Sequence, residues 1–320
     1  MQLFPITMAL FLLTGTGLAA GSDRSELITD DVQRFLAVFE AGLPDDTLQE
    51  RLQTSYFDPG TPGLAEYARR FGLTAETLAE SIRQYPDYYR SLSDIESRIA
   101  VQAPHIHTAL GRMLVLYPTT DLGPIYFVVG ALRAGGQNSS VGALISVEMF
   151  AADADIPEEV IPQGRLFPSS QLPIIIAHEM THRQQVRAQG IDAYLAIYDK
   201  QQSVLANAIR EGTAEFFARM TAGSTTDPAS YAFGLEHEAE IWEAFSKDKS
   251  KRDYGDWFYI RPKDHTDWPP DLGYFVGAQI AQSYYQNAPD KQAAIAEIFG
   301  VTDYDWLLSA SGYGINGFGD

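Results

Sequence analysis

The chain of 320 residues contains no cysteine. A disulfide framework, a thiolate metal ligand and a cysteine nucleophile are therefore excluded. Any metal site has to be built from histidines and carboxylates, which are the other common protein ligands of zinc.

Positive charge is also scarce. Lysine and arginine together number 23 against 42 acidic residues, so the formal net charge is -19 and the pI is near 4.6. A surface of this sign repels nucleic acid and anionic membrane surfaces. We therefore predict that neither is a partner.

Beyond the N-terminus, the sequence lacks any apolar run long enough to cross a membrane. The first 20 residues carry no charged side chain and combine an apolar stretch, from Ile6 to Leu13, with small residues at 17–20. This pattern is typical of a signal peptide, residues 1–20, and predicts a periplasmic or secreted protein. The alternative is an N-terminal membrane anchor, although the run is shorter than the roughly 20 apolar residues of a spanning helix.

The periodicity of the apolar residues predicts an α+β fold. Within residues 21–110 the apolar residues recur at helical spacing, as in Val32, Phe35, Leu36 and Phe39. This segment is therefore predicted to form a helical N-terminal region. Residues 111–320 are predicted to be the catalytic region. It begins with a small, mostly antiparallel sheet, for which we predict strands at 112–117, 124–129 and 141–150.

Helices are predicted again in the second half of the chain. The first begins at Ser169 or Ser170 and runs through the segment 178–182. A second spans about 200–222 and ends at Gly223, and further helices cover 231–245, 272–285 and 291–299. The glycines at 130, 135 and 136 are predicted to lie in a hairpin turn.

The segment His178-Glu179-Met180-Thr181-His182 has the H-E-x-x-H pattern. Residues four apart project from one face of a helix, so both imidazoles can reach the same metal ion. Glu179 then lies beside the pair, where it can take a proton from a water activated by the metal and pass it to a leaving group. The alternative is a surface helix with two unrelated histidines.

A catalytic zinc site needs a third protein ligand and an open fourth position. A metzincin would continue with glycine and histidine where this chain has Gln185 and Ala188, so that class is excluded. Glu211 offers the third ligand instead, because it shares an otherwise small and apolar helix face with Glu215, and buried carboxylates require a positive partner.

Glu215 lies one turn after Glu211 and could accept a hydrogen bond from the outer nitrogen of a ligating histidine. The alternative is that Glu215 pairs with Arg219 and that both acids are solvated. Gly212 is predicted to let the helices approach closely.

The motif pair resembles the gluzincin superfamily of zinc peptidases, in which a second helix supplies a glutamate ligand. The wider pattern also resembles bacterial predicted zinc proteases related to a gliding-motility lipoprotein, over 126–148, 178–215 and 271–285. This resemblance implies that 141–150 is the strand bordering the cleft. It also implies a hydrogen-bond donor to the oxyanion downstream of Glu211, for which Tyr274 is favoured over His265; a tyrosine packed in the core is the alternative.

The sequence therefore predicts a Zn²⁺-dependent peptidase acting on peptide or protein substrates. Two other classes stay open. One is a zinc-containing binding protein without turnover, against which Glu179 argues, because a purely structural site does not need that acid. The other is a zinc amide hydrolase with a non-peptide substrate, which would share the same chemistry.

Overall fold

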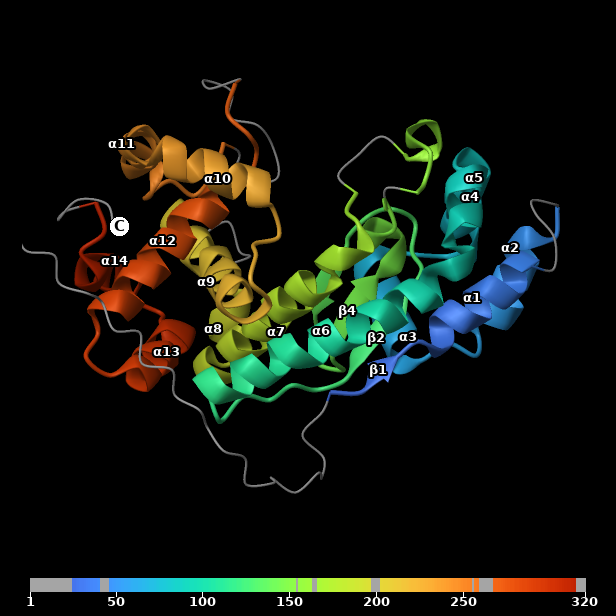
Figure 1. Ribbon diagram of the computed structural model, residues 1–320, viewed down its shortest axis with the longest axis horizontal. Coiled ribbons are helices and arrows are strands. Elements are labelled where there is room, and N and C mark those ends of the chain that lie inside the picture. Colours follow the sequence, from blue (N-terminus) through green and yellow to red (C-terminus); the bar gives the residue numbers. More distant parts are fainter. Residues whose placement is uncertain are drawn as a thin grey trace, which may run out of the picture.

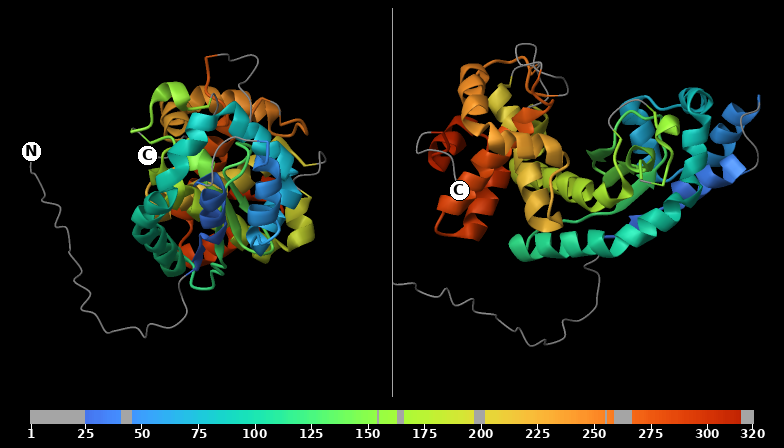
Figure 2. Two further views of the ribbon diagram at one scale, coloured as in Figure 1. Left: turned by 90° about the vertical axis from the view of Figure 1, so that its right-hand side faces the viewer. Right: turned by 45° about the horizontal axis from the view of Figure 1, so that its top comes forward.

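The computed structural model describes residues 25–40, 46–153, 155–162, 166–196, 202–254, 256–258 and 267–314. The predicted signal peptide lies outside these residues. In Figure 1 the first half of the chain forms one lobe and the second half forms another. Figure 2 shows that the long helix α6 (Ile95–Leu116) runs below both lobes.

The N-terminal lobe surrounds a small sheet with helices, as its periodicity predicts. Besides α6 these are α1 (Asp30–Glu40), α2 (Leu48–Leu52), α3 (Pro62–Phe71), α4 (Ala75–Gln84) and α5 (Pro86–Arg90). Threonine side chains define two of the starts: Thr61 accepts a hydrogen bond from the amide of Leu64, and Thr74 forms a capping box with Thr77.

The strand predicted at 112–117 is wrong, because this segment is the C-terminal end of α6. Ile106, Leu110 and Met113 are buried at helical spacing, so the apolar run continues the helix. A short apolar run cannot by itself distinguish a buried helix end from a strand.

The sheet has four strands in the order β1-β2-β4-β3, namely β1 (Leu27–Ile28), β2 (Ile125–Val128), β4 (Ala143–Ser146) and β3 (Gly136–Asn138). β1, β2 and β4 are parallel, with Ile125 opposite Ala143, whereas β3 pairs antiparallel with β4 and places Gly136 opposite Ile145. The sheet is therefore mixed rather than mostly antiparallel. The reason is that the segment between β2 and β4 is long enough for a crossover and contains a strand of its own where a turn was predicted.

The C-terminal lobe is helical, and its elements confirm most of the predicted helices. They are α7 (Leu172–Gln189), α8 (Ile191–Leu195), α9 (Val204–Ala222), α10 (Pro228–Glu236), α11 (Glu238–Asp248), α12 (Leu272–Asn287), α13 (Lys291–Gly300) and α14 (Tyr304–Ser311). The helix predicted over 231–245 is two helices, because the backbone leaves the helical conformation at His237. No helix in the described part of the chain is both long and apolar enough to span a bilayer.

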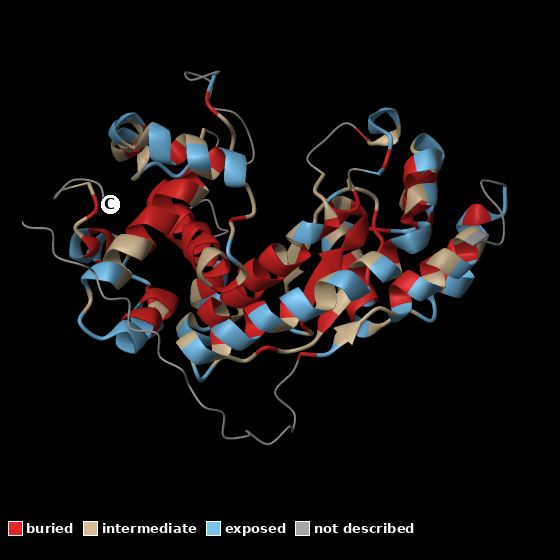
Figure 3. Ribbon diagram, viewed as in Figure 1, coloured by how far each residue is buried: buried red, intermediate tan, exposed pale blue. Residues whose placement is uncertain are grey.

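The two lobes have separate hydrophobic cores. Leu172, Ile176 and Met180 of α7 belong to the core around the sheet, whereas α9 and α12 contribute to the second core. α7 packs against α9, so these helices join the lobes. Figure 3 shows that α7, α9 and α12 are buried along much of their length.

Glycines allow α9 and α12 to pack with their backbones almost in contact. A Cβ atom on Gly277 would lie 1.7 Å from the carbonyl oxygen of Ala208, and one on Gly212 would lie 2.1 Å from the carbonyl carbon of Gly277. The close approach predicted for Gly212 therefore occurs, but with α12 rather than with the histidine-bearing helix. This contact fixes the position of the helix that carries Glu211.

Candidate metal centre

Local sequence explains why α7 and α9 begin and end where they do. A 3₁₀ turn at Ser169–Gln171 leads into α7, and Pro173 is tolerated in its first turn. α9 starts at Ser203, whose hydroxyl accepts a hydrogen bond from the amide of Ala206, and ends at Gly223, which adopts the left-handed conformation. The predicted end at Gly223 is confirmed.

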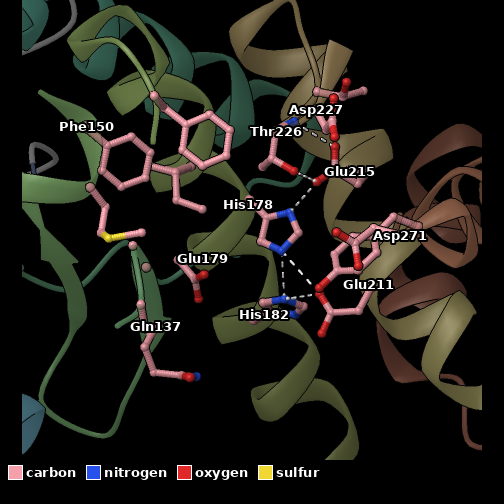
Figure 4. Close-up of a pocket in the computed structure, with 18 of the residues that line it drawn as sticks. Gln137, Phe150, His178, Glu179, His182, Glu211, Glu215, Thr226, Asp227 and Asp271 are labelled. Carbon is pink, nitrogen blue, oxygen red and sulfur yellow. Dashed lines mark hydrogen bonds and ion pairs between the residues drawn. The ribbon is translucent and has the colours of Figure 1, made fainter. Parts of the chain in front are cut away.

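The two helices bring three buried ligand atoms together (Figure 4). Nε2 of His182 lies 3.0 Å from Nε2 of His178 and 3.2 Å from Oε2 of Glu211, and Nε2 of His178 lies 3.3 Å from the same oxygen. Zinc bonds of 2.0–2.1 Å in a tetrahedral site imply ligand-to-ligand distances of about 3.3 Å. The donor set and its spacing therefore fit a zinc ion.

The outer nitrogen of each histidine also lies close to a side-chain oxygen. Nδ1 of His178 lies 3.1 Å from Oε1 of Glu215, and Nδ1 of His182 lies 2.8 Å from Oε1 of Gln185. The side chain of Glu215 also accepts hydrogen bonds from the amide and hydroxyl of Thr226. Such contacts fix the ring orientation and leave Nε2 of each ring facing Glu211.

Arg210 is buried beside the ligand set. Its guanidinium forms an ion pair with Oε1 of Glu211, donates to Asn207 at 3.0 Å, and lies 2% exposed. The carbonyl oxygen of Arg210 accepts a hydrogen bond from Gln185 at 2.9 Å. Arg210 therefore engages one oxygen of Glu211, while the other oxygen faces the histidines.

The carboxylates control the protonation of His178. Burial alone would lower the pKa of His178, but the hydrogen bonds to Glu211 and Glu215 outweigh it and raise the pKa to about 10. Burial acts on Glu211 in the opposite sense and would raise its pKa, but Arg210, His182 and His178 hold the pKa well below the usual range. In the metal-free site the protonated form of His178 is therefore favoured beside the ionised Glu211.

Glu179 lies in the same cleft, on the side that faces β3. Its side chain is buried, and its Oε2 atom has no hydrogen-bond partner within the described parts of the chain. Figure 4 shows the carboxylate beside His178 and opposite Glu211. A buried, unpartnered carboxylate oxygen next to a ligand set is suited to accept a proton from a bound molecule.

Tyr274 lines the cleft from the first turn of α12. Its ring stacks on that of His178, with a centroid distance of 6.3 Å, and also packs against Phe258. The structure thus brings Tyr274 to the site while also packing it against a core residue. The alternative donor, His265, lies outside the described residues.

The cleft has a volume of about 440 Å³, and its lining comes from both lobes. Part of the lining is apolar, and we call the following residues the apolar wall: Phe71, Met149, Phe150, Phe167 and Ile175. The strand at the cleft is β3, of which Gly136 and Gln137 are lining residues. The expectation that the segment 141–150 supplies this strand is wrong, because β4 lies inside the sheet between β2 and β3.

Three contributors to the site were missed from the sequence: Gln185, Arg210 and Thr226. Gln185 follows His182 by three residues on the same helix, which is a usable signal for a local contact. Arg210 precedes a predicted ligand, but its orientation depends on the packing of α9. Thr226 lies in the turn after α9 and offers no signal in the sequence.

One family model matches part of the chain. Residues 159–300 match the model of a family described as "Predicted Zn-dependent protease (DUF2268)". The matched region contains the three ligand residues, Glu179 and Tyr274, whereas the N-terminal lobe is not covered. No curated protein and no solved structure matches the chain. The family match and the buried cluster of His178, His182 and Glu211 agree on zinc as the cofactor.

Proposed function

We propose that the protein is a gluzincin-like zinc peptidase that hydrolyses peptide bonds in the cleft between its lobes. The observation that carries this proposal is the combination of the converging ligand atoms with the Glu179 carboxylate beside them, whose Oε2 atom has no hydrogen-bond partner in the described part of the chain. A purely structural site would not need an acid at that position.

In this proposal the ion would be held by His178 and His182 through their Nε2 atoms and by Glu211 through its Oε2 atom. A zinc ion held in this way lowers the pKa of water and polarises a carbonyl group. Glu179 accepts the proton of the attacking water and then delivers it to the leaving nitrogen. Tyr274 donates a hydrogen bond to the oxygen that becomes negatively charged.

The surrounding residues keep these groups in place. Glu215 fixes the ring of His178, Gln185 fixes the ring of His182, and Arg210 holds the outer oxygen of Glu211. Side chains fixed in this way need no reorganisation when the substrate arrives, which is the main source of electrostatic catalysis.

The lining of the cleft supports a preference among peptides. Phe150 of the apolar wall lies on the same side of His178 as Glu179 (Figure 4), and its ring stacks on that of Phe167. A large apolar side chain of the substrate would remove this surface from water. We therefore propose that the preferred substrates have a bulky apolar residue next to the bond that is cleaved.

We also propose that the chain is exported by its predicted signal peptide.

The test compares zinc content and hydrolysis of an unfolded protein substrate for the wild type, Glu179→Gln and Glu211→Ala. The wild type is expected to hold about one zinc ion. Glu179→Gln should keep the ion and lose hydrolysis by a factor of about 10² to 10⁴, because the proton acceptor is removed. Glu211→Ala should lose the ion.

Two results would contradict the proposal. Zinc binding without hydrolysis of any peptide would indicate a binding protein, or an amide hydrolase with another substrate. A wild type that binds no zinc would exclude all three functions.

A further inference from the structure

The segment between β2 and β3, residues 129–135, is held far more firmly than a surface connection requires. It leads directly into the cleft, where Ala134, Gly135 and Gly136 are lining residues. Gly136 lies against the proposed proton acceptor, because a Cβ atom on it would be 3.0 Å from Oε1 of Glu179 and 2.8 Å from Cγ1 of Ile175. The position of this loop therefore sets the space around Glu179.

The loop is bound by Glu148, an acid that the proposed mechanism does not use. Glu148 is completely buried in the turn Val147–Phe150 and accepts hydrogen bonds from the amides of Gly130 at 2.8 Å and Leu132 at 3.2 Å. The hydroxyl of Ser146 donates to both of its oxygens at 2.7 Å. Burial raises the pKa of Glu148, and the amide and hydroxyl donors oppose that rise because they favour the ionised carboxylate.

The backbone of the loop is shaped around this carboxylate. Leu132 has a positive φ of 56°, which a leucine rarely adopts, and its amide is one of the two that Glu148 binds. A Cβ atom on Gly130 would lie 2.8 Å from Oε1 of Glu148 and 2.7 Å from Oγ of Ser146. Only glycine therefore lets the loop approach the carboxylate this closely.

Buried tyrosines hold the carbonyl oxygens of the same loop. The donors come from helical segments of the N-terminal lobe: Tyr56 to Val129 at 2.7 Å, Tyr89 to Gly130 at 2.9 Å and Tyr67 to Ala134 at 3.0 Å. Amides and carbonyls of the loop are thus bound by side chains that are not among the lining residues of the cleft.

We infer that Glu148 is a positioning residue for the reaction: its carboxylate fixes the loop 129–135 and thereby places Gly136 against Glu179. This inference rests on the proposed peptidase function, but its contacts do not involve the metal ligands. A metal-binding role for Glu148 does not fit, because a cation would face the amide and hydroxyl donors that already surround the acid.

The variant Glu148→Gln tests the inference. The amide of glutamine offers one acceptor and two donors, so at least one loop amide would face another donor. We expect unchanged zinc content and a fall in kcat of about tenfold or more with little change in KM, because a displaced wall misplaces Glu179. Tyr67→Phe, which releases the carbonyl of Ala134, should act in the same direction.

Tyr313→Phe is the matched control. Tyr313 is also a buried tyrosine, but its hydroxyl donates to a side-chain oxygen of Glu238 in the C-terminal lobe at 2.8 Å and not to the loop or to Glu148. It should lower the free energy of unfolding while kcat stays at the wild-type value. A proportional loss of kcat and stability in all three variants would mean a merely structural role and would overturn the inference.

Amide hydrogen exchange provides a measurement that does not require hydrolysis. In Glu148→Gln, the amides of Gly130 and Leu132 should exchange faster than in the wild type, whereas the helical amides of α7 should not. If the wild type binds zinc but cleaves nothing, the proposed function fails. The exchange rates of the loop amides then decide whether Glu148 fixes the loop. If the wild type cleaves peptides and Glu148→Gln matches it in kcat and exchange, the inference fails.

Discussion

At the scale of single residues, the ring of His178 lies between two carboxylates. Its Nε2 atom faces Glu211 and its Nδ1 atom faces Glu215, with Glu179 adjacent in the sequence. These acids stabilise the imidazolium form, which is why the pKa of His178 is raised to about 10 in the metal-free protein. Zinc has to displace this proton, because only the neutral ring is a ligand.

The apparent zinc affinity should therefore keep rising with pH well above the ordinary histidine pKa of 6.5. We expect an increase of about tenfold per pH unit between pH 6.5 and about 10, since one proton is released per zinc bound. In Glu215→Gln the ring loses one of its acids, so the rise should level off at lower pH. Competition with a chelator of known pH dependence measures both curves, and a plateau near pH 6.5 in both proteins would contradict this account.

The raised pKa of His178 also determines how the stability of the metal-free protein depends on pH. Because the folded-state pKa of His178 exceeds its unfolded value of 6.5, the ionic cluster stabilises the metal-free protein fully below about pH 6.5. That contribution is lost as the pH rises through about 10. Zinc removes the dependence by taking the place of the proton.

Much of this site follows from local sequence. His178 and His182 are four residues apart on one helix, and Glu211 shares a helix face with Glu215, so helical geometry alone predicts which side chains point together. The residues that contact those side chains cannot be predicted in the same way. Arg210 and Thr226 reach the site only through the packing of α9 and the turn after it, which no spacing along the chain encodes.

At the scale of elements, the contact between Gly212 of α9 and Gly277 of α12 leaves no room for a larger side chain. Gly277→Ala would place a methyl group on the carbonyl of Ala208, so the helices would have to move apart. We expect a loss of about 1–3 kcal/mol in the free energy of unfolding, or more, together with weaker zinc binding, because Glu211 is carried by α9. Chemical denaturation and chelator competition measure the two effects.

Gly111→Ala in α6 is the control for that prediction. A Cβ atom there meets nothing within 4 Å, so the substitution should stabilise the helix by about 0.5–1 kcal/mol through its helix propensity. Equal effects of the two substitutions would show that α9 and α12 are not in backbone contact.

The elements themselves are predicted unevenly from the sequence. The helices with clear caps, such as α9 between Ser203 and Gly223, follow from local chemistry. The sheet does not, because β1 has only two residues and β3 only three, and their pairing depends on distant strands. β4 pairs with β2 on one side and with β3 on the other. This arrangement depends on the crossover connection and not on the sequences of the strands.

At the scale of the whole molecule, each lobe contributes a different part of the cleft. The apolar wall comes mostly from the N-terminal lobe, whereas Glu211, Glu215 and Tyr274 come from the C-terminal lobe. Substrate preference and metal binding should therefore be separable by mutation.

Phe167→Ala tests this separation. We expect kcat/KM to fall roughly tenfold or more for peptides with a bulky apolar residue beside the cleaved bond, because about 1.5–3 kcal/mol of burial is lost. The value for matched peptides with alanine there should hardly change, and zinc content should stay constant. Phe39→Ala removes a similarly half-buried ring from the same lobe, and an equal fall in that variant would exclude a specific role for the wall.

The packing of α9 against α12 also has a consequence for the order of events during biosynthesis. The chain has all three candidate ligand residues by position 211, but α12, one of the helices that pack against α9, begins only at Leu272. A nascent or truncated chain that ends between these positions contains α6 and α7 but lacks the close glycine contact of α9 with α12. On the proposed function, we therefore expect the site to be complete only after most of the polypeptide has emerged, so that a chain lacking α12 binds zinc more weakly than the full chain.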